Sequence, residues 1–259
     1  MTENILHPDS QKVFDAKTNL VVDFGNTLTK VAVYQSNELI YLEKTSLLTT
    51  NLLEQLRQAF FPDFAIISTV IEIPADLRQY LDTTFKFYEL THQTPVPVKN
   101  LYKTPETLGK DRLAAVIGAS ALFPGEDCLV IDAGTCITFD FIDRDAQYHG
   151  GSISPGISLR FKALHNFTSR LPLVSHRNFE GLIGCTTEES ILSGVLNGTT
   201  AELNCVINNY CNIYPGIKVV ITGGDMNYFD KKLKSNIFAV PNLVLMGLNV
   251  ILDFNVKEK

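Results

Sequence analysis

The sequence lacks the features of a membrane-spanning or secreted protein. Its longest apolar stretch, residues 113–123, is well short of the roughly 20 residues that cross a bilayer. The first residues, MTENILHPDSQK, include acidic side chains and no apolar run, so no secretory signal is predicted. The five cysteines form no Cys-x-x-Cys pair, which argues against a zinc site. These absences favour a cytoplasmic protein with reduced thiols and no membrane partner.

An excess of basic residues is also missing. The chain has 22 Lys and Arg against 28 Asp and Glu, a formal net charge of -6. Because binding to a phosphate backbone normally requires a basic face, no nucleic-acid partner is predicted. Neither G-x-x-x-x-G-K-[ST] nor G-x-G-x-x-G occurs, so the common nucleotide-binding loops are absent as well. A nucleotide bound through backbone N–H groups and a metal ion remains compatible with this charge.

A repeat at about half the chain length is present. Residues 20–34 read LVVDFGNTLTKVAVY, and residues 129–143 read LVIDAGTCITFDFID. Each segment has an apolar run, an Asp-x-Gly turn and a second β-prone run. The spacing is too long for a solenoid repeat, so it predicts two copies of one domain. With 259 residues, of which 45% are hydrophobic, the chain is long enough for two modest domains.

Strand and helix patterns alternate along the chain, which predicts an α/β protein. The two repeated segments read as β-hairpins, with buried first strands and outgoing second strands. The predicted strands are 20–23, 30–34, 129–132 and 136–140, and the predicted helices are 50–60, 110–122, 188–203 and 242–253. Residues 1–19 show no periodicity and are interpreted as an N-terminal extension.

Three glycine turns combine backbone N–H groups with carboxylates. They are Asp23-Phe24-Gly25, Asp132-Ala133-Gly134 and Gly223-Gly224-Asp225. Such turns bind anions without basic side chains, and an adjacent carboxylate can hold hydrated Mg²⁺. One Asp-x-Gly is typical of an ordinary turn. Two copies after matched strands favour phosphate binding.

These turns, together with further blocks, resemble the type III pantothenate kinases of the acetate kinase and actin superfamily. The family's Asp-x-Gly-Asn-Thr-x-x-Lys block is found at 23–30, and its Tyr-x-x-Pro and Gly-x-Asp-Arg blocks lie within 102–112. Its Asp-x-Gly-Thr lies at 132–135 and its Gly-Gly-x-Ile-x-Pro-Gly at 150–156. Two departures stand out: Lys110 occupies a position that is often small, and Cys185-Thr186-Thr187 replaces the usual Asn-Thr.

The resemblance implies two related actin-like (ribonuclease H-like) domains with a nucleotide cleft between them. The expected division is an extension at 1–19, an N-terminal domain at 20–110 and a C-terminal domain at 111–259. The resemblance also implies a homodimer. Residues 150–156 are expected to form a turn and the start of a helix near the substrates.

The reaction implied by the resemblance is ATP-dependent phosphorylation of pantothenate to 4'-phosphopantothenate, the first step of coenzyme A biosynthesis. Asp111 is the expected general base, which orients the acceptor hydroxyl. For an isolated aspartate, a helix N-cap is the alternative role. The expected substrate-binding residues are Tyr102, Gly109, Lys110, Asp111, Arg112 and Thr187, and Thr186 could replace Thr187.

The resemblance also implies the nucleotide and ion sites. The expected ATP-binding residues are Asp23, Phe24, Gly25, Asn26, Thr27, Leu28, Thr29, Lys30 and Thr135. Asp23 is expected to organise Mg²⁺ through water, and Asp132 to bind a monovalent cation, K⁺ or NH₄⁺.

Other functions stay open on the sequence. The chain could be a catalytically inactive or regulatory actin-like nucleotide-binding protein, or a filament protein that uses nucleotide as a switch. Another superfamily kinase, acting on a sugar or an acid, is a further alternative. The Gly109–Arg112 block argues against a filament protein, and the Tyr102–Arg112 segment argues against another superfamily kinase, which would share only the hairpins. The presence of Asp23, Asp111, Arg112 and Asp132 argues against a loss of catalysis.

Overall fold

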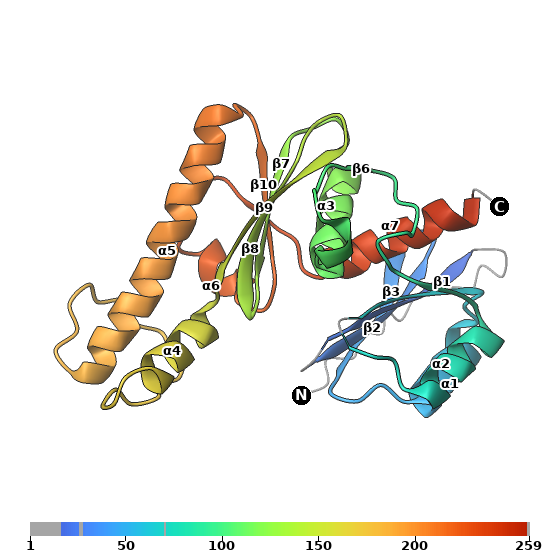
Figure 1. Cartoon of the computed structure of the whole chain (residues 1–259), viewed down its shortest axis with the longest axis horizontal. Coiled ribbons are helices and arrows are strands. Elements are labelled where there is room, and N and C mark those ends of the chain that lie inside the picture. Colours follow the sequence, from blue (N-terminus) through green and yellow to red (C-terminus); the bar gives the residue numbers. More distant parts are fainter. Residues whose placement is uncertain (1–16, 26–27, 70, 258–259) are drawn as a thin grey trace. The chain divides into compact units, whose positions relative to one another are not determined.

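The computed structural model describes residues 17–25, 28–69 and 71–257 (Figure 1). The chain forms two compact units. The first unit combines the segment up to Leu122 with the C-terminal segment from Leu243, and the second consists of Phe123–Asn242. This grouping differs from the expected division at 110 and 111, because two helices pack with the N-terminal sheet. Of the predicted extension, Thr18 and Asn19 lie in the first strand, and residues 1–16 lie outside the described ranges.

The first unit is built on a five-stranded sheet with the order β3-β2-β1-β4-β5. Strand β1 is antiparallel to β2 and parallel to β4. The strands are β1 Thr18–Phe24, β2 Thr29–Gln35, β3 Glu38–Thr45, β4 Phe64–Thr69 and β5 Lys86–Glu89. Helices α1 (Thr50–Phe60) and α2 (Ala75–Thr84) bury leucines against one face of this sheet.

Helix α1 has the bounds that the periodicity predicts, and contacts between neighbouring residues explain both of its ends. The hydroxyl of Thr49 accepts a hydrogen bond from the Leu52 N–H at 3.2 Å, which caps the first turn. Leu53 and Leu56, three residues apart, are buried in the core of the unit. Phe61 ends the helix in the left-handed conformation, with φ of 51°.

Helices α3 (Lys110–Leu122) and α7 (Leu243–Lys257) cross at close range within the first unit. A Cβ on Gly247 would lie 1.7 Å from the Ala114 carbonyl oxygen, and one on Gly118 would lie 2.7 Å from the Leu243 carbonyl oxygen. Only glycine permits this backbone approach. The crossing explains why residues from 243 onward join the first unit: α7 packs on α3 and also on β1 and β4.

The second unit repeats the topology of the first. Its strands run in the order β11-β10-β7-β8-β9, and β7 is antiparallel to β8 and parallel to β10. The strands are β7 Cys128–Ala133, β8 Cys136–Ile142, β9 Gln147–Pro155, β10 Lys218–Thr222 and β11 Phe238–Ala239. Strand β7 therefore corresponds to β1, so the predicted duplication of one domain is confirmed.

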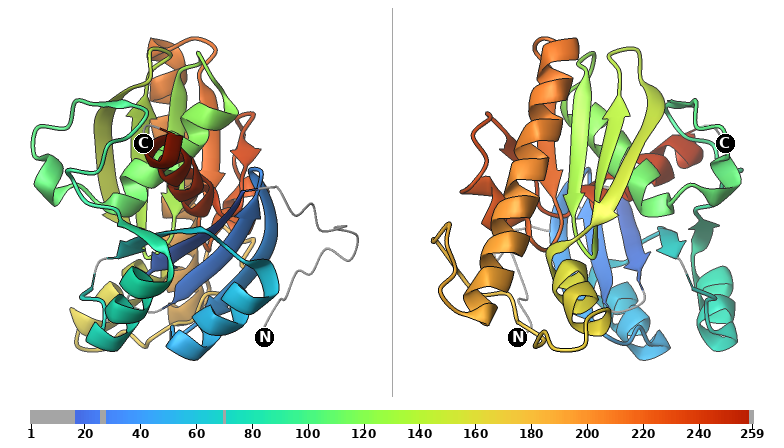
Figure 2. Two further views of the ribbon diagram at one scale, coloured as in Figure 1. Left: turned by 90° about the vertical axis from the view of Figure 1, so that its right-hand side faces the viewer. Right: turned by 60° about the vertical axis from the view of Figure 1, so that its left-hand side comes forward.

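Three helices complete the second unit: α4 (Ile157–Asn166), α5 (Thr187–Ile213) and α6 (Met226–Asp230). Figure 2 shows α5 beside the strands of its own unit, where its buried face joins their core. The helix is ten residues longer at its C-terminal end than the predicted 188–203 segment. The remaining described elements are β6, Lys99–Asn100, and the short helix η1, Pro105–Thr107.

The glycine-rich block at 150–156 is a strand and not the expected turn. Residues up to Pro155 belong to β9, and Gly156 is the N-cap of α4. A Cβ on Gly151 would lie 1.7 Å from the Phe139 carbonyl oxygen of β8. The glycine therefore serves a close backbone approach inside the sheet, and only the expected helix start is confirmed.

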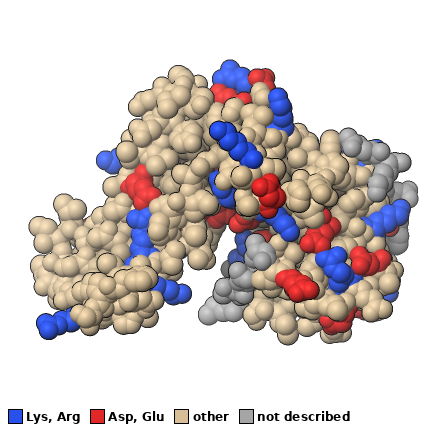
Figure 3. All heavy atoms as spheres, in the orientation of Figure 1, with Lys and Arg blue, Asp and Glu red and all other residues tan. Residues whose placement is uncertain are grey.

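In the described part of the chain, no helix is both long enough and apolar enough to cross a membrane. Figure 3 shows acidic and basic side chains interspersed over the face drawn.

Candidate active site

Asp23 lies at the carboxyl end of β1, one residue before the strand ends. Across the sheet it pairs in register with Lys30 of β2 on one side and with Ser68 of β4 on the other. The side chain is half-buried. Burial raises the pKa of Asp23 to about 6, Lys30 opposes this rise, and the Asp111 carboxylate adds to it. Asp23 and Asp111 are thus near enough to interact electrostatically, which makes this place favourable for a cation.

The turn after Asp23 closes tightly over its own backbone. A Cβ on Gly25 would lie 2.8 Å from the Leu28 carbonyl oxygen. Phe24 and Thr29 are buried, whereas Leu28 is exposed. Asn26 and Thr27, both predicted ATP-binding residues, lie outside the described residues.

Asp111 lies in the first turn of α3, beside Gly109. One oxygen of its carboxylate, Oδ1, accepts a hydrogen bond from the Arg112 N–H at 2.9 Å. A Cβ on Gly109 would lie 2.6 Å from that oxygen, so glycine leaves room for it. The helix begins at Lys110, and the Leu113 N–H donates to the Gly109 carbonyl at 3.2 Å. Asp111 is therefore the second residue of the helix and not its N-cap.

Arg112 and Tyr102 lie close together near the start of α3. The guanidinium carbon lies over the Tyr102 ring, 5.7 Å from its centre, and the arginine is 6% exposed. The Tyr102 N–H donates to the Asn100 side-chain oxygen at 2.9 Å. The contact is a cation–π interaction, and the fork of guanidinium donors suits carboxylate or phosphate oxygens.

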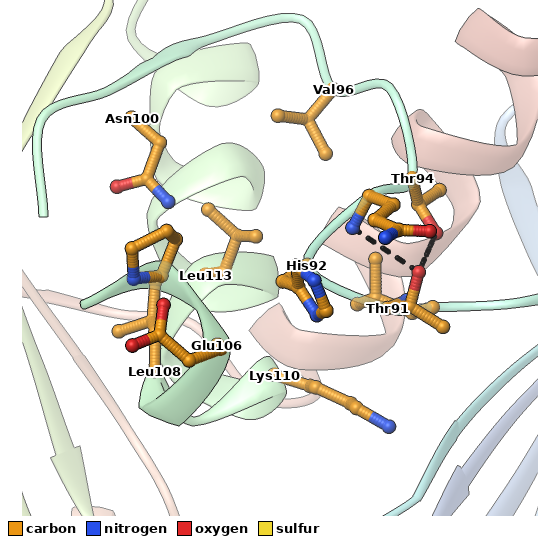
Figure 4. Close-up of a pocket in the computed structure, with 12 residues that line it drawn as sticks. Thr91, His92, Thr94, Val96, Asn100, Glu106, Leu108, Lys110 and Leu113 are labelled. Carbon is orange, nitrogen blue, oxygen red and sulfur yellow. Dashed lines mark hydrogen bonds between the residues drawn. The ribbon is translucent and has the colours of Figure 1, made fainter.

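Lys110 turns toward the end of β5. Its ammonium lies 3.9 Å from the Glu89 carboxylate, which also accepts a hydrogen bond from Arg78 of α2. Lys110 borders a cavity of about 400 Å³ whose floor includes Leu90, Leu108 and Leu113. In Figure 4 the lysine extends away from Glu106 along the edge of this cavity.

In the second unit, Asp132 occupies the position that Asp23 holds in the first. It pairs in register with Thr138 of β8 and with Thr222 of β10. Its Oδ1 would lie 2.5 Å from a Cβ on Gly223 and 3.3 Å from one on Gly134. Glycine at both turns thus lets the backbone close around this carboxylate, and Thr135 is exposed on the same turn.

Asp225 ends the third glycine turn and joins it to β7. Its N–H donates to the Ala133 carbonyl at 2.9 Å. Burial raises the pKa of the Asp225 carboxyl, and His176, with Nδ1 3.9 Å from Oδ1, opposes that rise. The turns that follow β7 and β10 therefore meet at one edge of this sheet.

The neighbouring threonines at the start of α5 differ in their surroundings. The Thr186 hydroxyl is the N-cap acceptor for the Glu189 N–H at 3.2 Å, and the Glu189 carboxylate accepts from the Cys185 N–H at 2.8 Å. Thr187 is exposed and lines a cavity of about 590 Å³ between α4 and α5. Thr187 therefore borders a cavity, whereas the Thr186 hydroxyl is used as a helix cap.

The structure brings the predicted residues into separate groups. Asp23, Lys30 and Asp111 interact in the first unit, where Arg112 also meets Tyr102. Asp132, Thr135 and Thr187 belong to the second unit. Glu89 was missed by sequence reasoning, because a lone acidic residue at the end of a four-residue strand carries no motif. Across the described ranges, no group of three or more His, Cys, Asp and Glu could hold a metal ion.

A family model and known relatives match most of this chain. A family model described as type III pantothenate kinase matches residues 19–209. A type III pantothenate kinase from Phocaeicola vulgatus is 48% identical over 240 residues, covering 92% of this chain and 99% of the relative.

Solved structures show the same fold. A Baf family protein from Campylobacter jejuni aligns with a TM-score of 0.55 and 23% identity, over 92% of this chain and 99% of its own. An inorganic polyphosphate/ATP-glucomannokinase from Arthrobacter aligns with a TM-score of 0.50 and 12% identity, over 92% and 99%. The α/β fold with two related actin-like units is thereby confirmed, while the nucleotide cleft between them stays a prediction. The chain belongs to the type III pantothenate kinase family.

Proposed function

We propose that this chain transfers the terminal phosphoryl group of ATP to the hydroxyl of pantothenate, and that Asp111 orients this hydroxyl and accepts its proton. Membership of the kinase family supports the reaction. The observation that carries the role of Asp111 is its position: an exposed carboxylate in the first turn of α3, near Asp23. Phosphoryl transfer passes through a loose transition state, so positioning and charge neutralisation supply most of the rate.

Arg112 and Tyr102 are proposed to bind pantothenate, together with the backbone at Gly109 and Lys110. The buried guanidinium beside the Tyr102 ring carries a fork of donors that suits the substrate carboxylate or phosphoryl oxygens. Thr187 is proposed as a further substrate contact, because it lines a cavity whereas Thr186 is used as a helix cap.

Mg²⁺ fits the carboxyl end of β1. Two carboxylates, Asp23 and Asp111, interact there, and burial disfavours the charged form of Asp23. A hydrated Mg²⁺ needs few protein ligands, so Asp23 would hold it through water while Lys30 and the 24–29 turn bind phosphates. When bound, the ion neutralises charge on the phosphates.

A monovalent cation fits Asp132. The carboxylate lies at the strand ends with Thr138 and Thr222 in register beside it, and hydroxyl, carboxylate and carbonyl oxygens are the donors that hard cations prefer. Asp132 would hold K⁺ or NH₄⁺, and Thr135 would face the phosphates.

A homodimer is part of the proposal. Large apolar side chains are exposed on α4 and the loop that leads to α5, including Phe167 at 88%, Leu182 at 80% and Ile183 at 80%. Figure 3 shows mostly uncharged atoms in this region. Exposed apolar surface of this kind marks an interaction site, and a second copy of the chain is the proposed occupant.

A cytoplasmic location is also part of the proposal. The five cysteines are free thiols, which suits a reducing compartment.

The decisive experiment measures ADP release with pantothenate in K⁺ buffer. We expect Asp111→Asn to lower kcat at least about 100-fold, in line with the loss of a general base, and to leave ATP and pantothenate binding measurable by calorimetry. Asp76→Asn is the matched control, because Asp76 is also the second residue of a helix, α2. A near-normal kcat in Asp111→Asn would remove Asp111 from the mechanism.

The same assay separates the alternatives. A panel of sugars and acetate in place of pantothenate tests for another kinase of the superfamily. ADP release that is independent of pantothenate would favour a nucleotide switch, and no pantothenate-dependent signal at all would overturn the proposed function.

A further inference from the structure

The first turn of α3 makes different packing contacts from the rest of the helix. The close crossing with α7 involves Ala114 and Gly118, so it lies one turn beyond Asp111. Within the described residues, contacts of the first turn include the Gly109–Leu113 hydrogen bond, the approach of the Arg112 guanidinium to the Tyr102 ring, and the ion pair between Lys110 and Glu89. The first two stay within residues 102–113, whereas the ion pair ties the helix to β5.

Glu89 is itself firmly placed. It is the last residue of β5, and its carboxylate accepts a hydrogen bond from Arg78 of α2. Its backbone carbonyl accepts one from the Thr94 hydroxyl at 3.1 Å. The carboxylate is 26% exposed and the Lys110 side chain 30%, so water only partly screens their attraction. One carboxylate thus links α2, the 91–94 loop and the first residue of α3.

We propose that Glu89 is a positioning residue for the kinase reaction, which acts through Lys110 to hold the first turn of α3 and with it Asp111. The inference rests on the proposed role of Asp111. A loose phosphoryl transfer depends on the alignment of the acceptor oxygen, so a small displacement of the orienting carboxylate reduces the rate. Loss of the Glu89 carboxylate would remove the ion pair that ties Lys110 to β5, so the first turn of α3 would be held less firmly.

The test is a double-mutant cycle with Glu89→Gln and Lys110→Met, measured by steady-state kinetics. We expect each single variant to lower kcat about fivefold, the effect of one partly exposed ion pair on alignment. The KM for ATP should change less than twofold, because ATP contacts other residues. The double variant should be no slower than the slower single variant, since both changes break one link. Lys110→Arg keeps the ion pair and should retain at least half of the wild-type kcat.

Arg57→Met is the matched control, because it breaks another ion pair of the same unit, the one with Glu54 within α1, which does not involve Glu89 or α3. It should keep the wild-type kcat. A wild-type kcat in Glu89→Gln, or effects of the two single variants that multiply in the double variant, would overturn the inference. If Glu89→Gln does not fold, Lys110→Met removes the other partner of the ion pair. A wild-type kcat in Lys110→Met would then overturn the inference. Asp111→Asn in the same assay tests the proposed function separately: full activity in that variant defeats the proposed function, whatever the cycle shows.

Discussion

At the scale of single residues, two aspartates in equivalent strands have different environments. Asp23 faces a lysine across the sheet and interacts with a second carboxylate, whereas Asp132 has threonines in register on both sides. The duplicated turn therefore provides a site with two carboxylates in one unit and a site with one carboxylate among hydroxyls in the other. These differences match the two kinds of ion that the proposed function assigns to them.

The raised pKa of Asp23 has a consequence for stability. Because its folded pKa of about 6 exceeds the unfolded value of 3.8, the folded state binds more protons between these values. The free energy of unfolding should therefore fall as pH rises from about 4 to 6 and stay lower above that range. The decrease should amount to about 3 kcal/mol in the wild type and should be absent in Asp23→Asn.

Urea unfolding between about pH 4 and 7, with EDTA present, measures this difference. Asp76→Asn is the control, since it replaces an aspartate in a helix of the same unit. An equal pH dependence in Asp23→Asn and the wild type would show that Asp23 titrates normally.

At the scale of elements, the crossing of α3 and α7 decides which unit the C-terminal segment joins. Gly247 and Gly118 bring the two backbones into contact. The buried leucines of α7 then pack in the first unit. The same contact supports α3 just beyond the turn that carries Asp111.

Gly247→Ala should lower the free energy of unfolding by about 2–3 kcal/mol, because the new Cβ overlaps the Ala114 carbonyl oxygen and forces the helices apart. Denaturant unfolding measures the loss. Gly198→Ala in α5 is the matched helical control: a Cβ there meets nothing within 4 Å. It should raise stability by roughly 0.5–1 kcal/mol, through helix propensity. An unchanged free energy of unfolding in Gly247→Ala would mean that α3 and α7 can move apart without a loss of stability.

At the scale of the whole molecule, each unit has its own core and its own sheet, built to one plan. The second unit differs in its long helix α5 and in the exposed apolar side chains near α4. The proposed dimer uses these features of the second unit.

Charges introduced at Leu182 and Ile183, as L182E and I183E together, should convert a dimer into a monomer in sedimentation velocity. Burying two carboxylates in an apolar interface costs more than the interface gains. Leu47→Glu is the control, because Leu47 is 69% exposed on the first unit. A wild-type protein that sediments as a monomer with full activity would refute the proposed dimer.

The local pattern of the sequence was enough to predict the helix bounds of α1 and α3 and the four strands of the repeat. Periodicity, caps and glycine turns are properties of neighbouring residues, and they specify local structure. The motifs also identified Asp23, Asp111 and Asp132 as candidates, because the Asp-x-Gly turns recur and the Gly-x-Asp-Arg block is specific.

Only the tertiary structure decided which distant segments pack together. The sequence placed residues 243–257 with the second domain, yet two glycines in separate helices bring α7 onto α3 in the first. The sequence could not rank Thr186 against Thr187, because capping depends on where α5 begins. It could not identify Glu89 either, since an ion pair to Lys110 exists only once β5 and α3 are packed. Close backbone approach and the ion pair between Glu89 and Lys110 join segments that are far apart in the sequence, and such contacts are what the fold adds to it.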